Sequence, residues 1–166
     1  MHTRGLIVAA TIFDAVLAGT GVDRVLVQMP AWRAVGVAGW AAYSRHADLG
    51  NGLVLYSTVA IAGCALSVAA AITVARQRAG RRPVTIPAYL AAALTVLGLL
   101  LTIKAAPFML SLRHVGDDPM ALQRAFDGFD WWGNIRSVAQ IAAFVANLWS
   151  LVAMCHSAAP GENRAT

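Results

Sequence analysis

The stretch "LGNGLVLYSTVAIAGCALSVAAAITVA", Leu49–Ala75, decides the fold class of this chain because it holds no Asp, Glu, Lys, Arg or His. A helix that crosses a bilayer needs about 20 consecutive apolar residues, and this stretch is longer than that. Three further stretches have the same character, and they cover Gly5–Met29, Ile86–Leu112 and Gly133–His156. The sequence therefore predicts an all-α integral membrane protein, a four-helix bundle.

The overall composition agrees with this fold class. Of the 166 residues, 58% are hydrophobic and only 13% are charged, which is about half the charged share of a soluble domain. The net charge of +5 does not indicate a nucleic-acid partner, because it leans on one short basic segment, "RQRAGRR", without interleaved aromatic residues. A basic loop beside the membrane explains that segment, and we expect no nucleic-acid partner.

The order of the stretches predicts one transmembrane domain, residues 1–156, followed by a polar tail, residues 157–166. Arg and Lys on short loops set the orientation of membrane helices. The Arg76–Arg82 loop lies on the same side as both termini, so we expect both termini in the cytoplasm and the chain in the cell (inner) membrane. Asp14 interrupts the first stretch, which favours a retained helix over a cleaved signal peptide.

The two longer polar segments should face outward and hold short interfacial helices. Asp118 is expected to cap a helix that starts at Pro119. Gly128 is expected to end that helix, and Asp130 to cap the last spanning helix. In the other segment, Pro30–Asp48, the aromatic residues Trp32, Trp40 and Tyr43 should lie at the level of the lipid headgroups.

Ionisable residues inside spans are costly and indicate functional sites. Asp23, Arg24, Lys104 and Arg136 lie at one depth, in the outer part of three predicted helices. Asn51 and Tyr56 bring polar groups of a further helix to the same depth. We therefore predict a polar layer in the outer half of the bundle, where it forms either a site or a structural ion-pair network.

Helical phase on the last span adds a second criterion. With about 100° per residue, Trp132, Arg136, Gln140 and Asn147 fall on one stripe, whereas Asn134 points to the other side. Asp14 lies outside the polar layer, nearer the cytoplasmic half, and it fits a lone hydrogen-bonding residue between helices.

The motifs of common cofactor sites are absent from the sequence. It holds no phosphate-binding glycine loop, no His-x-Glu or Cys-x-x-Cys metal pattern, and no Ser or Cys nucleophile beside a base. We therefore expect no metal site and no tightly held cofactor.

Three short motifs resemble one known family, the anthrone oxygenase-like membrane proteins, which include a bacterial domain of unknown function. They are "AGTGVDRVLVQMP" (residues 18–30), "ADLGNGLVLY" (residues 47–56) and the entry to the last helix, "WGNIR" (residues 132–136). The resemblance implies a four-helix membrane fold and oxidation of a lipophilic aromatic molecule of the polyketide type by dioxygen without a bound cofactor. It supports Trp132, Asn134 and Arg136 as family positions, and Asn51 less directly.

The chemistry would need a base, a cation for the substrate anion and a dry aromatic pocket. Asp23 or Tyr56 could serve as the base, and Lys104 and Arg136 could hold the anion, with Arg24 as a further substrate-binding residue. The orienting polar groups and the stacking ring would then come from Asn51, Asn134, Gln140 and Trp132.

An alternative of another class remains open at this stage. The chain could be a small non-catalytic membrane protein that binds a lipid, a quinone or a partner subunit through the same layer. It could also assemble with itself as a homo-oligomer.

Overall fold

A computed structural model describes residues 2–77 and 82–158 of the chain, and these residues are organised as long helices. The elements are α1 (His2–Asp23), a π-helical segment η1 (Arg24–Gln28), α2 (Met29–His46), a second π-helical segment η2 (Ala47–Gly52), α3 (Leu53–Arg76), α4 (Arg82–Ser111) and α5 (Pro119–Ala158). Arg78 and Arg81 of the basic loop lie outside the described residues, as does the tail from residue 159 onward.

Three helical runs are long and apolar enough to cross a membrane, judged by length and composition: Thr3–Arg76, Pro83–Ser111 and Pro119–His156. The first run has 74 residues, which exceeds the length of a single span of about 20 residues. Large apolar side chains are widely exposed on the helices, for example Ile61 at 58% and Val138 at 68%. The all-α class expected from the sequence is therefore confirmed, and the long apolar helices are consistent with membrane spans.

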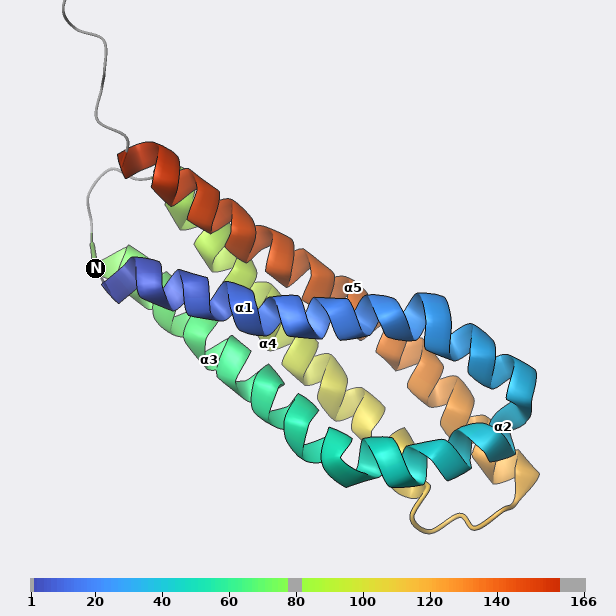
Figure 1. The fold of residues 1–166 in the computed structure, drawn as a ribbon. Helices are drawn as coiled ribbons and strands as arrows, with labels where there is room; N and C mark the ends of the chain where they lie inside the picture. Colours follow the sequence, from blue (N-terminus) through green and yellow to red (C-terminus); the bar gives the residue numbers. More distant parts are fainter. Residues whose placement is uncertain (1, 78–81, 159–166) are drawn as a thin grey trace, which may run out of the picture.

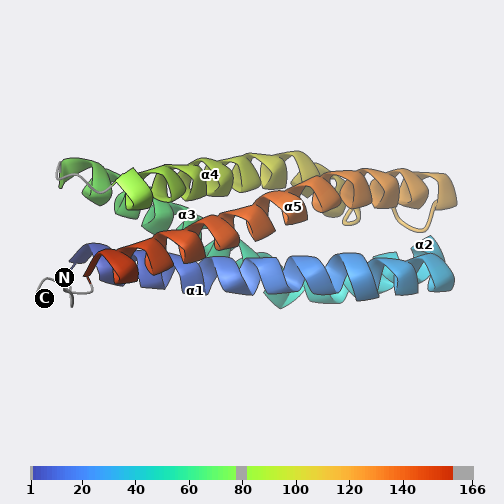
Figure 2. The same ribbon diagram turned by 90° about the horizontal axis from the view of Figure 1, so that it is seen from above.

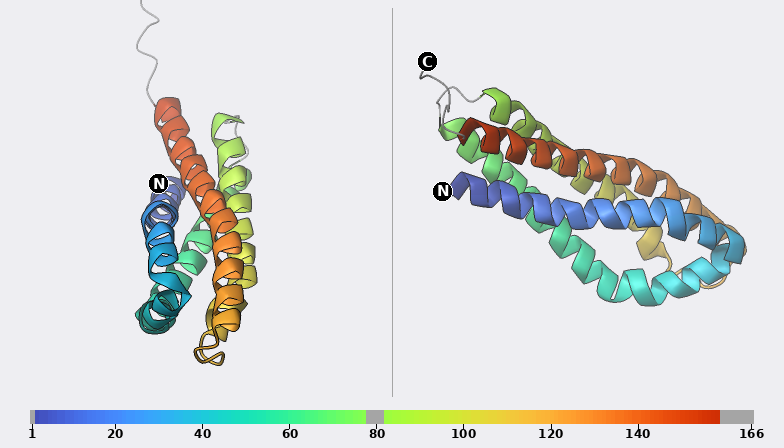
Figure 3. Two further views of the ribbon diagram at one scale, coloured as in Figure 1. Left: turned by 90° about the vertical axis from the view of Figure 1, so that its right-hand side faces the viewer. Right: turned by 45° about the horizontal axis from the view of Figure 1, so that its top comes forward.

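The four long helices pack side by side in a ring. α1 packs against α3 and α5, and α4 packs against the same two helices, so that α1 and α4 lie at opposite corners. Figure 1 and Figure 2 show the start of α1 and the end of α5 at one end of the bundle, and α2 at the other. The two views of Figure 3 show the same arrangement along the bundle and from its side. The polar residues near α2 are therefore gathered at one end.

Helix α2 packs across the ends of α4 and α5 and contributes to the main core there. Trp40 has no exposed surface, and its ring contacts Phe126 and Phe129 at centroid distances of 5.2 and 6.0 Å. Trp32 is also buried, whereas Tyr43 is exposed. Both tryptophan rings are therefore buried in protein, since packing against α5 competes with the membrane interface for these rings. The expectation that the aromatic residues of this segment lie at headgroup level stays a prediction.

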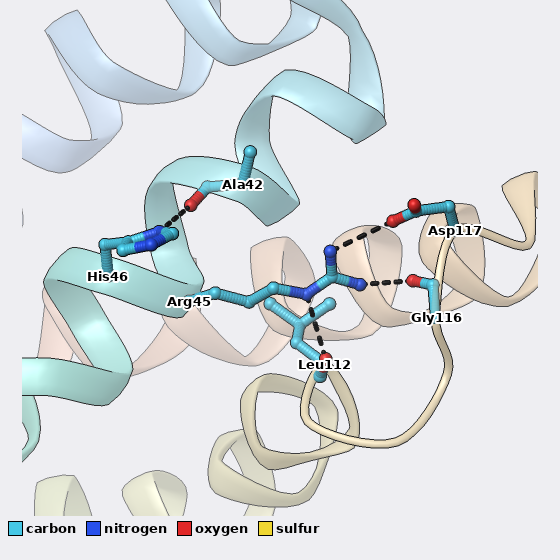
Figure 4. A network of polar contacts seen from close by, with 6 residues as sticks. All are labelled: Ala42, Arg45, His46, Leu112, Gly116 and Asp117. Carbon is cyan, nitrogen blue, oxygen red and sulfur yellow. Dashed lines mark hydrogen bonds and ion pairs between the residues drawn. The ribbon is translucent and has the colours of Figure 1, made fainter.

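A break at one glycine folds helix α2 back on the bundle. Gly36 has φ 84° and ψ 165°, a conformation that residues with a Cβ rarely adopt. Beyond the break, Arg45 reaches the connection between α4 and α5. It donates hydrogen bonds to the carbonyl oxygen of Leu112 at 3.0 Å, to the carbonyl oxygen of Gly116, and to the carboxylate of Asp117 at 3.0 Å (Figure 4). These bonds hold α2 against the ends of α4 and α5.

Helix α5 begins as predicted but does not break where predicted. The backbone N–H of Met120 donates to Oδ1 of Asp118 at 3.1 Å, which confirms Asp118 as the cap. The helix does not end at Gly128 but continues through it, and its total length is 40 residues. A Cβ at Gly128 would overlap the ring of Phe108, so the glycine permits close approach of α4 and does not end a helix. Asp130 is consequently not a cap.

Candidate functional site

A cavity of about 170 Å³ lies inside the ring of helices, at the end nearest α2. Its walls come from α1 with η1, from η2 with α3, from α4 and from α5. The volume is below the range of about 300–1,000 Å³ that is usual for drug-sized ligands. The cavity therefore suits the polar part of a ligand better than the whole of a large one.

The cavity reaches the outer surface of the bundle on the side of α3 and α4. Leu53, Tyr56 and Leu110 line it and are nevertheless 40%, 42% and 37% exposed. Leu53 and Leu110 belong to the exposed apolar surface of the helices. An apolar ligand body can thus extend from the cavity along this apolar outer surface.

Both π-helical segments of the chain's first half contribute to the wall. Asp23, Arg24 and Gln28 come from the junction of α1 with η1, and Asp48 comes from η2. A π turn inserts one residue into a helix and redirects the side chains beside it, and such turns are frequent at functional sites. The helical path is therefore interrupted where the polar side chains meet.

Arg24 enters the cavity from η1 over the face of an aromatic ring. Its guanidinium carbon lies 3.7 Å from the ring centroid of Phe129 and 5.7 Å from that of Trp32. Stacking on these rings orients the planar group. The Nη2 atom is buried and has no hydrogen-bond partner in the described structure. One donor of a positively charged group beside the cavity therefore lacks a partner.

Arg136 lines the cavity from α5 and also has a donor without a partner. Its Nε atom is buried and lacks a hydrogen-bond partner among the described residues. The side chains of both arginines line the same cavity. Buried charges in proteins are normally paired, because desolvating an unpaired charge is costly. Two adjacent cations with free donors therefore indicate a site for an anion or a strong hydrogen-bond acceptor.

Neither arginine makes an ion pair. Within residues 2–77 and 82–158, the ion pairs join Arg33 to Asp130 at 2.6 Å and Arg45 to Asp117 at 3.0 Å. Asp23 instead accepts a hydrogen bond from Nε2 of Gln28 at 2.5 Å. The alternative of a structural ion-pair network in the polar layer is therefore not supported.

Five of the nine residues predicted from the sequence line the cavity: Asp23, Arg24, Tyr56, Arg136 and Gln140. Lys104 does not, and its side chain is exposed. At about 100° per residue, Lys104 points about 160° away from Thr102 and from Ala106, two of the α4 residues that line the cavity. The prediction that Lys104 joins the layer is wrong because depth alone does not give the helical face.

The other three predicted site residues, Asn51, Trp132 and Asn134, lie outside the cavity wall. Asn51 is exposed on η2, and Trp132 packs against the core around α2. Asn134 donates to Oδ1 of Asp130 at 3.0 Å. None of the three is part of the cavity wall, so Phe129 takes the place expected for a Trp132 ring.

Asp48 is the main residue that sequence reasoning missed. It was assigned to an outer loop, but it lines the cavity from η2, and its Oδ2 atom is buried without a partner among the described residues. The available signal was its position directly before the apolar run that starts at Leu49.

A second polar cluster joins three helices away from the cavity. Nδ2 of Asn147 donates to Oδ2 of Asp14 at 2.6 Å and to Oγ of Ser67 at 2.9 Å, and all three side chains are buried. The interpretation of Asp14 as a hydrogen-bonding residue between helices is confirmed. Asn147 therefore acts here and not in the stripe headed by Arg136.

Comparisons with protein-family models, with curated proteins and with solved structures found no match to this chain. The functional interpretation therefore depends on the cavity and on the resemblance of the three short motifs.

Proposed function

We propose that the chain crosses the cell membrane four times, through α1, α3, α4 and α5, with both termini in the cytoplasm. The lengths of these helices, 22, 24, 30 and 40 residues, support the proposal, because about 20 residues suffice for one span. The basic segment between α3 and α4 supports the orientation. The cavity then lies in the outer half of the membrane.

Within this frame, the cavity binds the anionic form of a lipophilic aromatic molecule. The observation that carries this proposal is the pair of buried, unpartnered donors, Nη2 of Arg24 and Nε of Arg136, on two side chains that line one cavity. Phe129 supplies an aromatic wall beside them. Gln140, which also lines the cavity, orients the ligand through its amide.

The reaction is an oxidation by dioxygen of the anthrone oxygenase type, as the motif resemblance implies. Removal of a proton gives an electron-rich anion, which the two arginines stabilise in a site with little water. One oxygen atom of dioxygen enters the ring as a new carbonyl. The other leaves as water, together with the two hydrogens of the oxidised CH₂ group, so that the reaction needs no further reductant.

Purified protein in lipid nanodiscs, a model anthrone and an oxygen electrode test the activity. We expect oxygen uptake above that of empty nanodiscs. Arg24→Gln and Arg136→Gln should each lower it by roughly 10- to 100-fold, since a hydrogen bond to a charged group contributes about 1.5–3 kcal/mol. Arg124→Gln is the matched control, because Arg124 is exposed and remote from the cavity wall.

The alternative, a membrane protein that binds a ligand without oxidising it, is supported by the same two arginines, Arg24 and Arg136. Two free guanidinium donors also fit a lipid phosphate or the oxygen of a quinone. An anionic probe that binds the protein, and loses affinity in Arg24→Gln and Arg136→Gln, without any oxygen uptake from an anthrone would favour this alternative. Neither binding nor oxygen uptake would refute both.

A further inference from the structure

The carboxylate of Asp48 has no assigned role in the proposed function, although it shares the cavity with Arg24 and Arg136. It attracts both guanidinium groups electrostatically. It nevertheless makes an ion pair with neither, since the ion pairs of the described residues lie elsewhere. An opposite charge is therefore held near two cations with a gap between them.

The gap leaves three buried polar atoms unsatisfied at once: Oδ2 of Asp48, Nη2 of Arg24 and Nε of Arg136. Each such orphaned atom costs about 1–3 kcal/mol or more. A ligand group that both donates and accepts hydrogen bonds suits a cavity lined by one such carboxylate and two such guanidinium groups. A hydroxyl group has this capacity, because it carries one O–H donor and two acceptor lone pairs.

The other acidic groups of the wall fit this position less well. Asp23 is exposed and already accepts a hydrogen bond from Gln28. Tyr56 is 42% exposed and stands at the surface of the bundle. Asp14 lies behind the cavity and is bonded to Asn147. Among the carboxylates that line the cavity, Asp23 and Asp48, only Asp48 has a buried oxygen without a partner.

We propose that Asp48 is the catalytic base of the cavity and takes the proton from an acidic hydroxyl group of the ligand, a phenol or an enol. The proposal rests on the proposed function, which it deepens. It selects the substrate class, because a ligand whose oxygen is blocked as an ether cannot donate to Oδ2 of Asp48. Such a ligand would leave that atom unsatisfied.

The step balances without an oxidant. The O–H bond of the ligand breaks, and its proton forms a new O–H bond at Oδ2 of Asp48. The electron pair of the broken bond stays on the ligand oxygen, which accepts hydrogen bonds from Arg24 and Arg136. One negative charge moves from the carboxylate to the ligand, so the net charge of the cavity is unchanged.

A chromogenic probe separates this role from anion binding. An alkyl-substituted nitrophenol absorbs differently as phenol and as phenolate, and an alkylnaphthalene sulfonate is an anion that needs no base. In nanodiscs, at a pH where the free nitrophenol is protonated, we expect the protein to bind it as the phenolate. In the unsubstituted protein, nitrophenol affinity should change little with pH below the pKa of the free phenol, because the proton stays on Asp48. In Asp48→Asn it should fall about 10-fold per pH unit in that range, because the proton is then released to the solvent. Sulfonate affinity should be equal or higher in Asp48→Asn, because a repelling charge is removed.

The sulfonate also reports whether the variant is folded. Asp127→Asn is the matched control that should keep the pH dependence of the unsubstituted protein, because Asp127 is exposed and does not line the cavity. Sulfonate binding with the same pH dependence of nitrophenol affinity in Asp48→Asn as in the unsubstituted protein would overturn the role of Asp48 and leave the anion site intact. Sulfonate binding without any phenolate signal in the unsubstituted protein would do the same. Absence of sulfonate binding to the unsubstituted protein would refute the anion site, and the role of Asp48 falls with it.

Discussion

Replacing Asn147 with leucine is expected to destabilise the bundle by about 2–4 kcal/mol. The substitution removes the hydrogen bonds to Asp14 and Ser67 at 2.6 and 2.9 Å. Interhelical hydrogen bonds in membranes contribute about 0.6–1.7 kcal/mol each. Asp14, which is 2% exposed, then loses its donor, which adds about 1–3 kcal/mol. The apolar leucine side chain offsets roughly 1 kcal/mol of this sum.

Equilibrium unfolding in mixed micelles or bicelles, followed by circular dichroism, measures the change. Asn51→Leu is the matched control, because Asn51 is exposed on η2, and it should shift stability by no more than about 0.5 kcal/mol. Asp14→Leu in the Asn147→Leu background should cost less than the sum of the single changes, since no orphaned carboxyl remains. A shift for Asn147→Leu as small as that of Asn51→Leu would refute the reasoning.

Two further predictions concern the contacts that position the helices. Gly128→Ala should lower stability by about 1–3 kcal/mol in the same unfolding assay, because its Cβ would overlap the Phe108 ring. Gly19→Ala, with open space around it, should be neutral or stabilising by up to about 1 kcal/mol, and equal effects would contradict the first expectation. Arg45→Ala should speed hydrogen exchange of residues 112–117, to which its guanidinium donates; unchanged exchange there would show that the contacts do not hold this connection.

Features that depend on local chemistry were predictable from the sequence. The apolar runs identify the long helices, because only burial in lipid or protein accommodates them. The Asp118-Pro119 pair marks a helix start, since both residues act within one turn. A single aspartate in an apolar helix, Asp14, must find a donor on another helix. None of these inferences requires knowledge of how the helices face one another.

Features that depend on packing were not predictable in this way. Gly128 carries the same letter as a helix terminator, but Phe108 from α4 packs on it. Lys104 has the depth of the other charges and points away from them, because the rotation of α4 in the bundle is set by its neighbours. Asp48 lines the cavity because the helical path is irregular at η2, which the sequence does not indicate.

The distribution of partners among the arginines is the strongest physical reason to regard the cavity as functional. Arg33 and Arg45 have carboxylate partners, although their own side chains are 57% and 29% exposed, where an ion pair contributes about 0–1 kcal/mol. Arg24 and Arg136 have buried donors, where pairing would contribute most, and they make no ion pair in the described structure. Asp48 lines the same cavity and makes an ion pair with neither in the described structure. Optimising stability alone would close that gap, so the open arrangement is better explained by a ligand that completes it.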